Sequence, residues 1–439
     1  MNYSDKAKQI LEMNWRDGYT IPSSTLYPFQ WNWDAGFHAL GWMYVKPERA
    51  IQEIKSMFKG QWINGMLPHI VFHKENENYF PGPEEWKTHL SKNKVESIAT
   101  SGISQLPVFG FFIERLDQIA DEIGYDIKDF ILEILPKIIH FHEYLYTNRD
   151  PLEEGLPFVL HNWESTDNAP IWDEIWNNMN VEDARDVSLL RKDLKNVDPS
   201  MRPTHEHYKR YIYLIDLLAK NNYEEQKLIR QYPFLVQESL FLSLLIRSNE
   251  GLINLGRKYD INIEMVYQWQ AKSKMSFSDK LWDEENSIYY AFDLNSSALI
   301  KKDIIGGLIP LFAGIPTPEQ AKKMADKIES TFILNENWFL CPSYSPNSLD
   351  FDPKKYWRGP IWPNVNWLLY HGLKRYGFME LANKIKLQTM QLIEEVGFFE
   401  YFDPRPIKDS KMEEKGLGGH NFSWTSAIYL DYLYNTSIF

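Results

Sequence analysis

Four carboxylates and two tryptophans lie between residues 161 and 174. This stretch is not typical of a helix, because the polar side chains of residues 165–168 compete for backbone hydrogen bonds and Pro170 removes a backbone donor. Ala169, which precedes the proline, is pushed toward an extended conformation. The pattern predicts a structured loop that presents a carboxylic acid among aromatic rings. Paired carboxylates and aromatic faces suit sugar chemistry, and Asp167 is the candidate acid.

A second cluster of aromatic and acidic residues lies at positions 27–34 and contains Tyr27, Trp31, Trp33 and Asp34. Asp34 can act as the cap of the helix that follows. Alternatively, its carboxylate can accept hydroxyl protons from a sugar whose C–H face lies on an aromatic ring. Both interpretations remain open at this stage.

Two later stretches combine aromatic rings with groups that break helices. Tyr356, Trp357 and Trp362 lie in a segment with one glycine and two prolines, which predicts either an aromatic platform or a packed structural loop. Glu400 is flanked by aromatic residues on both sides. A carboxylate in such surroundings is costly unless it is hydrogen-bonded or used in chemistry.

Histidines and one arginine offer further chemistry. His205 and His207 are two residues apart after Pro203, whereas a zincin helix places its histidines four apart, so a metal site is not predicted. Arg202 can hold a carboxylate or phosphate with its fork of donors, or it can form an ordinary ion pair. The motifs of nucleotide-binding loops are absent from the sequence, and no cofactor is expected.

Composition narrows the class of protein. The chain has 439 residues, of which 44% are hydrophobic, and no linker-like stretch, so a single domain with a large core is expected. A formal net charge of −13 argues against nucleic-acid or anionic-membrane partners. The polar N-terminal stretch and the single cysteine suggest a cytoplasmic protein. A homo-oligomer remains possible.

Helical periodicity dominates the chain, and about a dozen helices are expected. They lie at 50–58, 107–123, 129–146, 208–219, 233–248, 250–259, 263–280, 317–329, 365–376, 379–395 and 423–434. Pro136 predicts a kink or a break, and residues 287–293 and 398–402 predict short hairpin strands. An irregular bundle and an (α/α)6 toroid both fit this count. The toroid has the advantage that it brings the aromatic and acidic loops to one mouth.

The motifs, taken in order, resemble glycoside hydrolase family 63, and most closely its members that hydrolyse mannosylglycerate and glucosylglycerate. The matching pieces are 29–38 (FQWNWDAGFH), 67–72 (LPHIVF), 79–83 (YFPGP), 163–170 (WES-x-DN-x-P), 356–363 (YWRGPIWP), 400–404 (EYFDP) and 422–425 (FSWT). The resemblance implies an all-α (α/α)6 toroid with inserted loops and minor β-hairpins. It also implies one catalytic domain, residues 1–439, with loop insertions near 60–100 and 165–210.

Residue roles follow from the resemblance alone. Asp167 matches the general acid and Glu400 the general base of an inverting hydrolysis, and Asp167 is expected to have a raised pKa. Substrate-binding residues implied by the match are Tyr27, Trp31, Trp33, Asp34, Tyr79, Gln105, Arg202, Tyr208, Tyr356, Trp357, Trp362 and His420. Arg202, Tyr208 and Tyr79 would hold a glycerate carboxylate, with His420 or Asn421 in the place of a glutamine.

The expected function is hydrolysis of an α-glucosyl or α-mannosyl glycerate to the sugar and glycerate, without a metal. One alternative is an α-glucosidase that acts on a neutral disaccharide such as kojibiose or trehalose, with Arg202 purely structural. A sugar epimerase is a second alternative and would need paired histidines at the centre, for which His161, His205 and His420 are candidates. A non-catalytic sugar-binding protein is the third.

Overall fold

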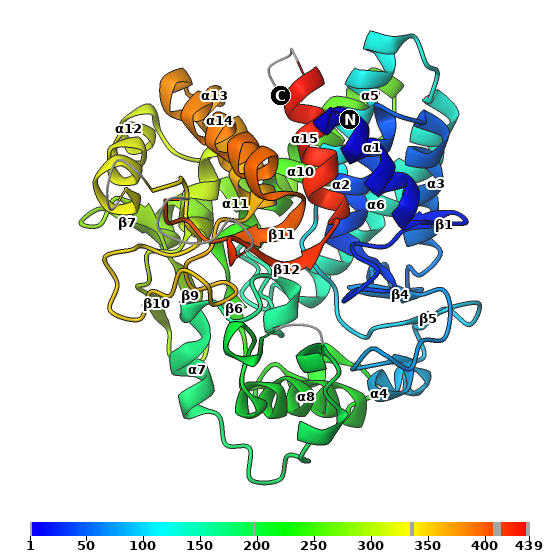
Figure 1. Cartoon of the computed structure of the whole chain (residues 1–439). Coiled ribbons are helices and arrows are strands. Elements are labelled where there is room, and N and C mark those ends of the chain that lie inside the picture. Colours follow the sequence, from blue (N-terminus) through cyan, green and yellow to red (C-terminus); the bar gives the residue numbers. More distant parts are fainter. Residues whose placement is uncertain (1, 196–197, 334–337, 407–413, 436–439) are drawn as a thin grey trace.

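Two concentric rings of helices organise the chain (Figure 1). The computed structural model describes residues 2–195, 198–333, 338–406 and 414–435. The inner ring closes on itself, because each element packs on the next and the last packs on the first. In order it contains α2 (Asn32–Met43), α5 (Phe109–Ile123), α10 (Ser239–Tyr259), the 3-10 helix η7 (Ile305–Leu311), α13 (Pro363–Arg375) and α15 (Ser423–Tyr434).

The outer ring alternates with the inner one along the chain. It contains α1 (Tyr3–Asn14), α3 (Pro47–Phe58), α6 (Lys128–Asn148), α11 (Glu264–Leu281), α12 (Pro318–Lys327) and α14 (Met379–Val396). Every residue of α2 is buried, as befits a helix surrounded by protein, whereas α3 and α12 bury one face only. The architecture is an (α/α)6 toroid, which confirms the predicted fold class.

Three local predictions were wrong or incomplete. The two segments expected at 233–248 and 250–259 form the single helix α10, whose interior polar residue Asn249 is satisfied by Tyr146 on α6. Helix α6 runs through Pro136 without the break that was one of the two expectations there, and the kink stays a prediction. Asp34 is not a helix cap, because α2 begins two residues earlier and the cap position is occupied by Trp31.

Short strands connect the rings. The sheets are β1 (Trp15–Arg16) with β2 (Tyr19–Thr20); β3 (Gln30–Trp31), β4 (Ile70–Phe72) and β5 (Ala99–Thr100); β10 (Ala298–Ile300), β9 (Ala291–Asp293) and β6 (Val236–Gln237); β7 (Trp282–Asp283) with β8 (Ile288–Tyr289); and β11 (Phe399–Phe402) with β12 (Gly416–His420). All pairs are antiparallel. The predicted strands at 287–293 and 398–402 are confirmed.

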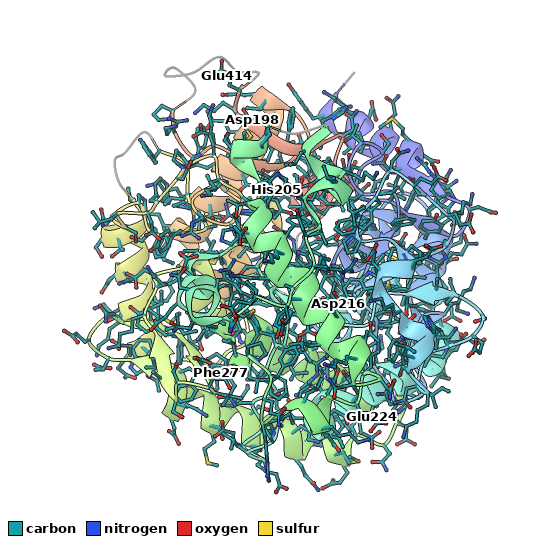
Figure 2. The ribbon with its side chains drawn as sticks, turned by 90° about the horizontal axis from the view of Figure 1, so that it is seen from below. Asp198, His205, Asp216, Glu224, Phe277 and Glu414 are labelled. Carbon is teal, nitrogen blue, oxygen red and sulfur yellow. The ribbon has the colours of Figure 1, made fainter. Side chains whose placement is uncertain are left out.

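One face of the toroid is covered by the described part of residues 149–238, the segment between α6 and α10, which we call the excursion. It includes α7 (Asp173–Asn178), α8 (His205–Lys220) and α9 (Glu225–Leu228), with α4 (Pro83–Trp86) beside α8. Figure 2 shows α8 lying across this face, from His205 past Asp216. Among the described residues, no helix has the length and apolar character to cross a membrane. The division of the chain into one domain with two insertions stays a prediction.

Candidate active site

A cavity of about 970 Å³, including its open mouth, lies between the ring and the excursion. Thirteen of the fourteen predicted site residues line it, and they come from opposite ends of the chain. They are Tyr27, Trp31, Trp33, Asp34, Tyr79, Gln105, Asp167, Arg202, Tyr208, Tyr356, Trp357, Trp362 and Glu400. The closed ring therefore brings Asp167 and Glu400 to the same cavity, although 233 residues separate them (400 − 167).

Glu400 is held by three hydrogen-bond donors. The hydroxyl groups of Tyr27 and Tyr356 donate to Oε1 at 2.9 and 3.1 Å, and the backbone N–H of Gly419 donates to Oε2 at 2.9 Å. Burial raises the pKa of Glu400 above its ordinary value, while Arg202 and these donors oppose the rise. The three donors favour the ionised form of Glu400, and an ionised carboxylate can accept a proton.

Two glycines on β12 allow this arrangement. Gly418 has a φ of +71°, and a Cβ there would lie 2.3 Å from Oε2 of Glu400. Any side chain would therefore displace the carboxylate, so the close approach of the backbone needs glycine. The next residue, Gly419, supplies the donor.

Asp167 has a different environment. Its Oδ1 accepts one hydrogen bond, from Nδ2 of Asn162 at 2.8 Å. Burial raises the pKa of Asp167 to about 6, Asp193 adds to the rise, and Arg202 opposes it. The expected raised pKa is confirmed, but the acidic neighbour responsible is Asp193 rather than the carboxylates of the 161–174 stretch.

Two of those other carboxylates, Glu164 and Asp173, hold the loop in place. Glu164 is fully buried and accepts from both Nη atoms of Arg149, at 3.1 and 3.2 Å. Asp173 pairs with Arg358, whose Nη1 lies 2.8 Å from Oδ1. Both ion pairs lie within six residues of Asp167, one on each side, so they position the loop that carries it.

The loop is also tied to the aromatic platform. Oδ1 of Asn168 accepts from the backbone N–H of Trp357 at 2.9 Å. The rings of Trp357 and Trp362 stack at 3.8 Å with an interplanar angle of 4°, and Tyr401 stacks on the far side of Trp362 at 4.7 Å. Such flat apolar faces suit the C–H face of a sugar.

Inner helix α2 contributes Trp33 and Asp34 to the cavity lining. Oε1 of Gln105 accepts from the backbone N–H of Trp33 at 2.9 Å, and the Trp33 and Trp357 rings are 6.4 Å apart. Burial raises the pKa of Asp34 well above its ordinary value, and Glu400 adds to the rise. Oδ1 of Asp34 has no hydrogen-bond partner among the described residues, which leaves it for a ligand hydroxyl.

Arg202 lines the cavity beside the two tyrosines that hold Glu400 and is only 5% exposed. Its Nε donates to Oδ2 of Asp193 at 3.1 Å, its Nη1 donates to the hydroxyl of Tyr27 at 3.3 Å, and its guanidinium lies 4.6 Å from the centre of the Tyr356 ring. Arg202 is thus both ion-paired and in the cavity lining, so the two interpretations left open by the sequence are partly combined.

His420 is the exception among the predicted site residues. It is exposed at the end of β12 and is not among the residues that line the cavity. The contact with a ligand expected of His420 therefore has no support in this structure.

Several lining residues were not predicted. They are Pro22, Thr25, Leu26, His69, Asn78, Phe80, Trp163, Ser165, Lys192, Asp193, Phe422 and Trp424. Trp163, Ser165, Phe422 and Trp424 lie inside motifs that the sequence analysis singled out, so the signal was present. Lys192 and Asp193 lie in a charged run that reads as ordinary surface.

The histidine constellations do not assemble. His161 is buried and hydrogen-bonded to the backbone carbonyl of Tyr211, whereas His205 and His420 are exposed, so the three do not meet. His207 instead forms the capping box of α8 with Thr204. The described part of the chain contains no group of three or more His, Cys, Asp or Glu side chains able to hold a metal ion.

Together these groups can perform acid–base chemistry on a sugar. One carboxyl group has a pKa of about 6 and can donate a proton, and a second can accept one. The aromatic faces in the cavity lining and the unpartnered Oδ1 of Asp34 suit a sugar ring.

Comparison with known proteins gives consistent results. Residues 27–425 match the model of the mannosylglycerate hydrolase MGH1-like glycoside hydrolase domain. The mannosylglycerate hydrolase of Rubrobacter radiotolerans is 37% identical over 97% of this chain and 95% of that protein. The glucosylglycerate hydrolase of Mycolicibacterium hassiacum is 29% identical over 98% and 97%. The crystal structure of a family 63 mannosylglycerate hydrolase from Thermus thermophilus with Tris and D-glycerate superposes with a TM-score of 0.89, at 36% identity, over 98% of this chain and all of that one.

Proposed function

The chain belongs to the mannosylglycerate hydrolase MGH1-like family of glycoside hydrolases, and from this premise we propose that it cleaves an α-mannosyl or α-glucosyl glycerate to the sugar and glycerate. That the protein is a glycoside hydrolase follows from the family. The observation that carries the finer proposal is the buried Arg202, which shares one cavity with both Asp167 and Glu400. Arginine suits the carboxylate of a glycerate leaving group.

The proposed mechanism is an inverting hydrolysis. Asp167 donates its proton to the glycosidic oxygen as the bond from that oxygen to the anomeric carbon breaks. Glu400 takes a proton from a water molecule, whose oxygen attacks the anomeric carbon from the opposite face. Exchange of protons with solvent then restores the protonated Asp167 and the ionised Glu400.

The environments of the two carboxyl groups support these roles. A pKa of about 6 keeps much of Asp167 protonated in mildly acidic solution, as a general acid requires. The Gly419 N–H can only donate, so it favours the charged form of Glu400 that a base needs. A cytoplasmic location is part of the proposal, because the one cysteine, Cys341, is free and buried.

The decisive experiment is a substrate panel with a neutral twin of the proposed substrate. Mannosylglycerate is tested first, since the relatives with that printed name are 34–37% identical to this chain, against 29% for the glucosylglycerate enzyme. Glucosylglycerate, glucosylglycerol, trehalose and kojibiose complete the panel. We expect both glycerates to be turned over with a kcat/KM at least tenfold above that of glucosylglycerol, and NMR to show the β-anomer first. An α-anomer would contradict inversion.

One observation favours hydrolysis of a neutral disaccharide as the second candidate function. The Asp193–Arg202 ion pair already satisfies part of the guanidinium charge. The variant Arg202→Met separates the two candidates. We expect it to lower kcat/KM for mannosylglycerate about 100-fold, the effect of losing a hydrogen-bonded charge, and to change glucosylglycerol little. Equal losses on both substrates would assign Arg202 to the scaffold.

A further inference from the structure

A short charged segment, Arg191-Lys192-Asp193, precedes Arg202 in the sequence and contributes Lys192 and Asp193 to the cavity lining. Asp193 bridges the two arginines, because Arg191 donates from Nε to Oδ1 at 3.1 Å and from Nη2 to Oδ2 at 2.8 Å, while Arg202 donates to Oδ2 at 3.1 Å. The guanidinium of Arg191 lies 3.9 Å from the centre of the Tyr208 ring. These contacts fix the segment over the cavity.

Lys192 lies between two residues that are held in this way and is one of the residues that line the cavity. No hydrogen bond or ion pair of Lys192 is formed within the described residues, in contrast with Arg191, Asp193 and Arg202 beside it. A lysine in a cavity lining that has no counter-ion among the described residues has its donors available to a ligand.

The balance of charges in the cavity lining makes Lys192 important for binding an anionic ligand. Four carboxyl groups (Asp34, Asp167, Asp193 and Glu400) and two cations (Lys192 and Arg202) line it among the described residues. Arg202 already shares its charge with Asp193. An anionic ligand that entered a protein of net charge −13 would therefore meet an unfavourable balance if Arg202 acted alone.

We propose that Lys192 is a second binding residue for the carboxylate of the substrate's leaving group and selects anionic over neutral substrates. Arg202, with its Nε and Nη1 engaged, presents Nη2 to one carboxylate oxygen, and the Lys192 ammonium takes the other. Asp193 is a positioning residue that keeps Arg202 in this orientation. The inference rests on the proposed function, since it requires a substrate that carries a carboxylate.

The test compares Lys192→Met with wild type on mannosylglycerate and glucosylglycerol. Methionine keeps the length of the side chain and removes its charge. Loss of a hydrogen bond to a charged group corresponds to a factor of roughly 10 to 100. We expect KM for mannosylglycerate to rise by about this factor with kcat within about threefold of wild type, and both constants for glucosylglycerol to stay unchanged. Lys192→Arg should restore much of the affinity.

The matched control is Lys74→Met, which removes the same charge from an exposed lysine outside the cavity lining. We expect it to leave KM unchanged, so that an effect of Lys192 is not one of net charge. An unchanged KM in Lys192→Met, or an equal loss on both substrates, would overturn the inference. If wild-type enzyme itself does not prefer the glycerate, the proposed function fails first, and that outcome is distinct because it appears without any variant.

Discussion

Glu400 and Asp167 are both carboxyl groups of one cavity, but the parts of the molecule that hold them differ. Glu400 lies on β11, next to inner helix α15, and accepts from three donors. Asp167 lies on a loop of the excursion, where Asn162 donates to its carboxylate and hydrogen bonding with Tyr211 and Trp163 also lowers its pKa. The comparison teaches that burial raises the pKa of both groups, and that the different tasks proposed for them depend on which neighbours oppose this rise.

The largest expected effect is on kcat, and it distinguishes Asp167 from Glu400 when substrates with different leaving groups are compared. Asp167→Asn should lower kcat on mannosylglycerate by about 10² to 10⁴-fold, the usual contribution of general acid catalysis. The same variant should hydrolyse α-mannosyl fluoride at near the wild-type rate, because fluoride leaves without a proton. Glu400→Gln should lose activity on both substrates. Steady-state kinetics with the four combinations checks this, and an Asp167→Asn variant that fails equally on the fluoride would contradict the acid role.

The pH dependence is the next largest effect. A general acid must be protonated, so kcat/KM should fall as the pH rises through the pKa of Asp167 near 6, about tenfold per unit above it. On the fluoride this basic limb should be absent, since no proton is needed from Asp167. A limb that persists on both substrates would belong to another group.

A smaller effect concerns the donors to Glu400. Tyr356→Phe removes one donor to Oε1 and keeps the ring beneath Arg202. The pKa of Glu400 should rise, because the charged form loses a hydrogen bond, so the acidic limb of kcat/KM should move to higher pH with a loss of about tenfold below it. Tyr401→Phe is the matched control, because the buried Tyr401 hydroxyl has no partner among the described residues. A shift of similar size in the control would remove the special role of Tyr356.

The smallest effect is on stability. Because the folded pKa of Asp167 lies above its ordinary value of 3.8, this group binds more protons in the folded state, and its ionisation costs stability as the pH rises through 4 to 6. At pH 7 the cost is at most about 3 kcal/mol. Asp167→Asn should therefore raise Tm by a few degrees at pH 7 and not at pH 4, as measured by calorimetry. A lower Tm at pH 7 would mean that the carboxylate stabilises the loop.

The sequence predicts the ring better than the excursion. Amphipathic helices and aromatic motifs can be recognised by their spacing, which is why inner helix α5 and outer helices α11 and α14 were expected close to their observed bounds. Lys192 and Asp193 give no such signal, since a charged run usually forms a solvated surface. Their place in the cavity depends on Arg191 and Arg202, which sequence spacing does not join. The sequence left open whether Asp34 caps a helix or lines a site, because capping residues and first-turn residues look alike in sequence.

The closure of the inner ring affects the order in which the cavity can assemble during synthesis. The seam joins α2 to α15, and the side chain of Asn14 donates to both the Asn421 carbonyl and the Ser423 hydroxyl across it. A chain emerging from the ribosome therefore possesses Asp167 long before it can assemble the surroundings of Glu400, because Glu400 needs Gly418 and Gly419 to be made. Under the proposed mechanism, a chain cut before Gly418 would carry half of the chemistry and release no sugar.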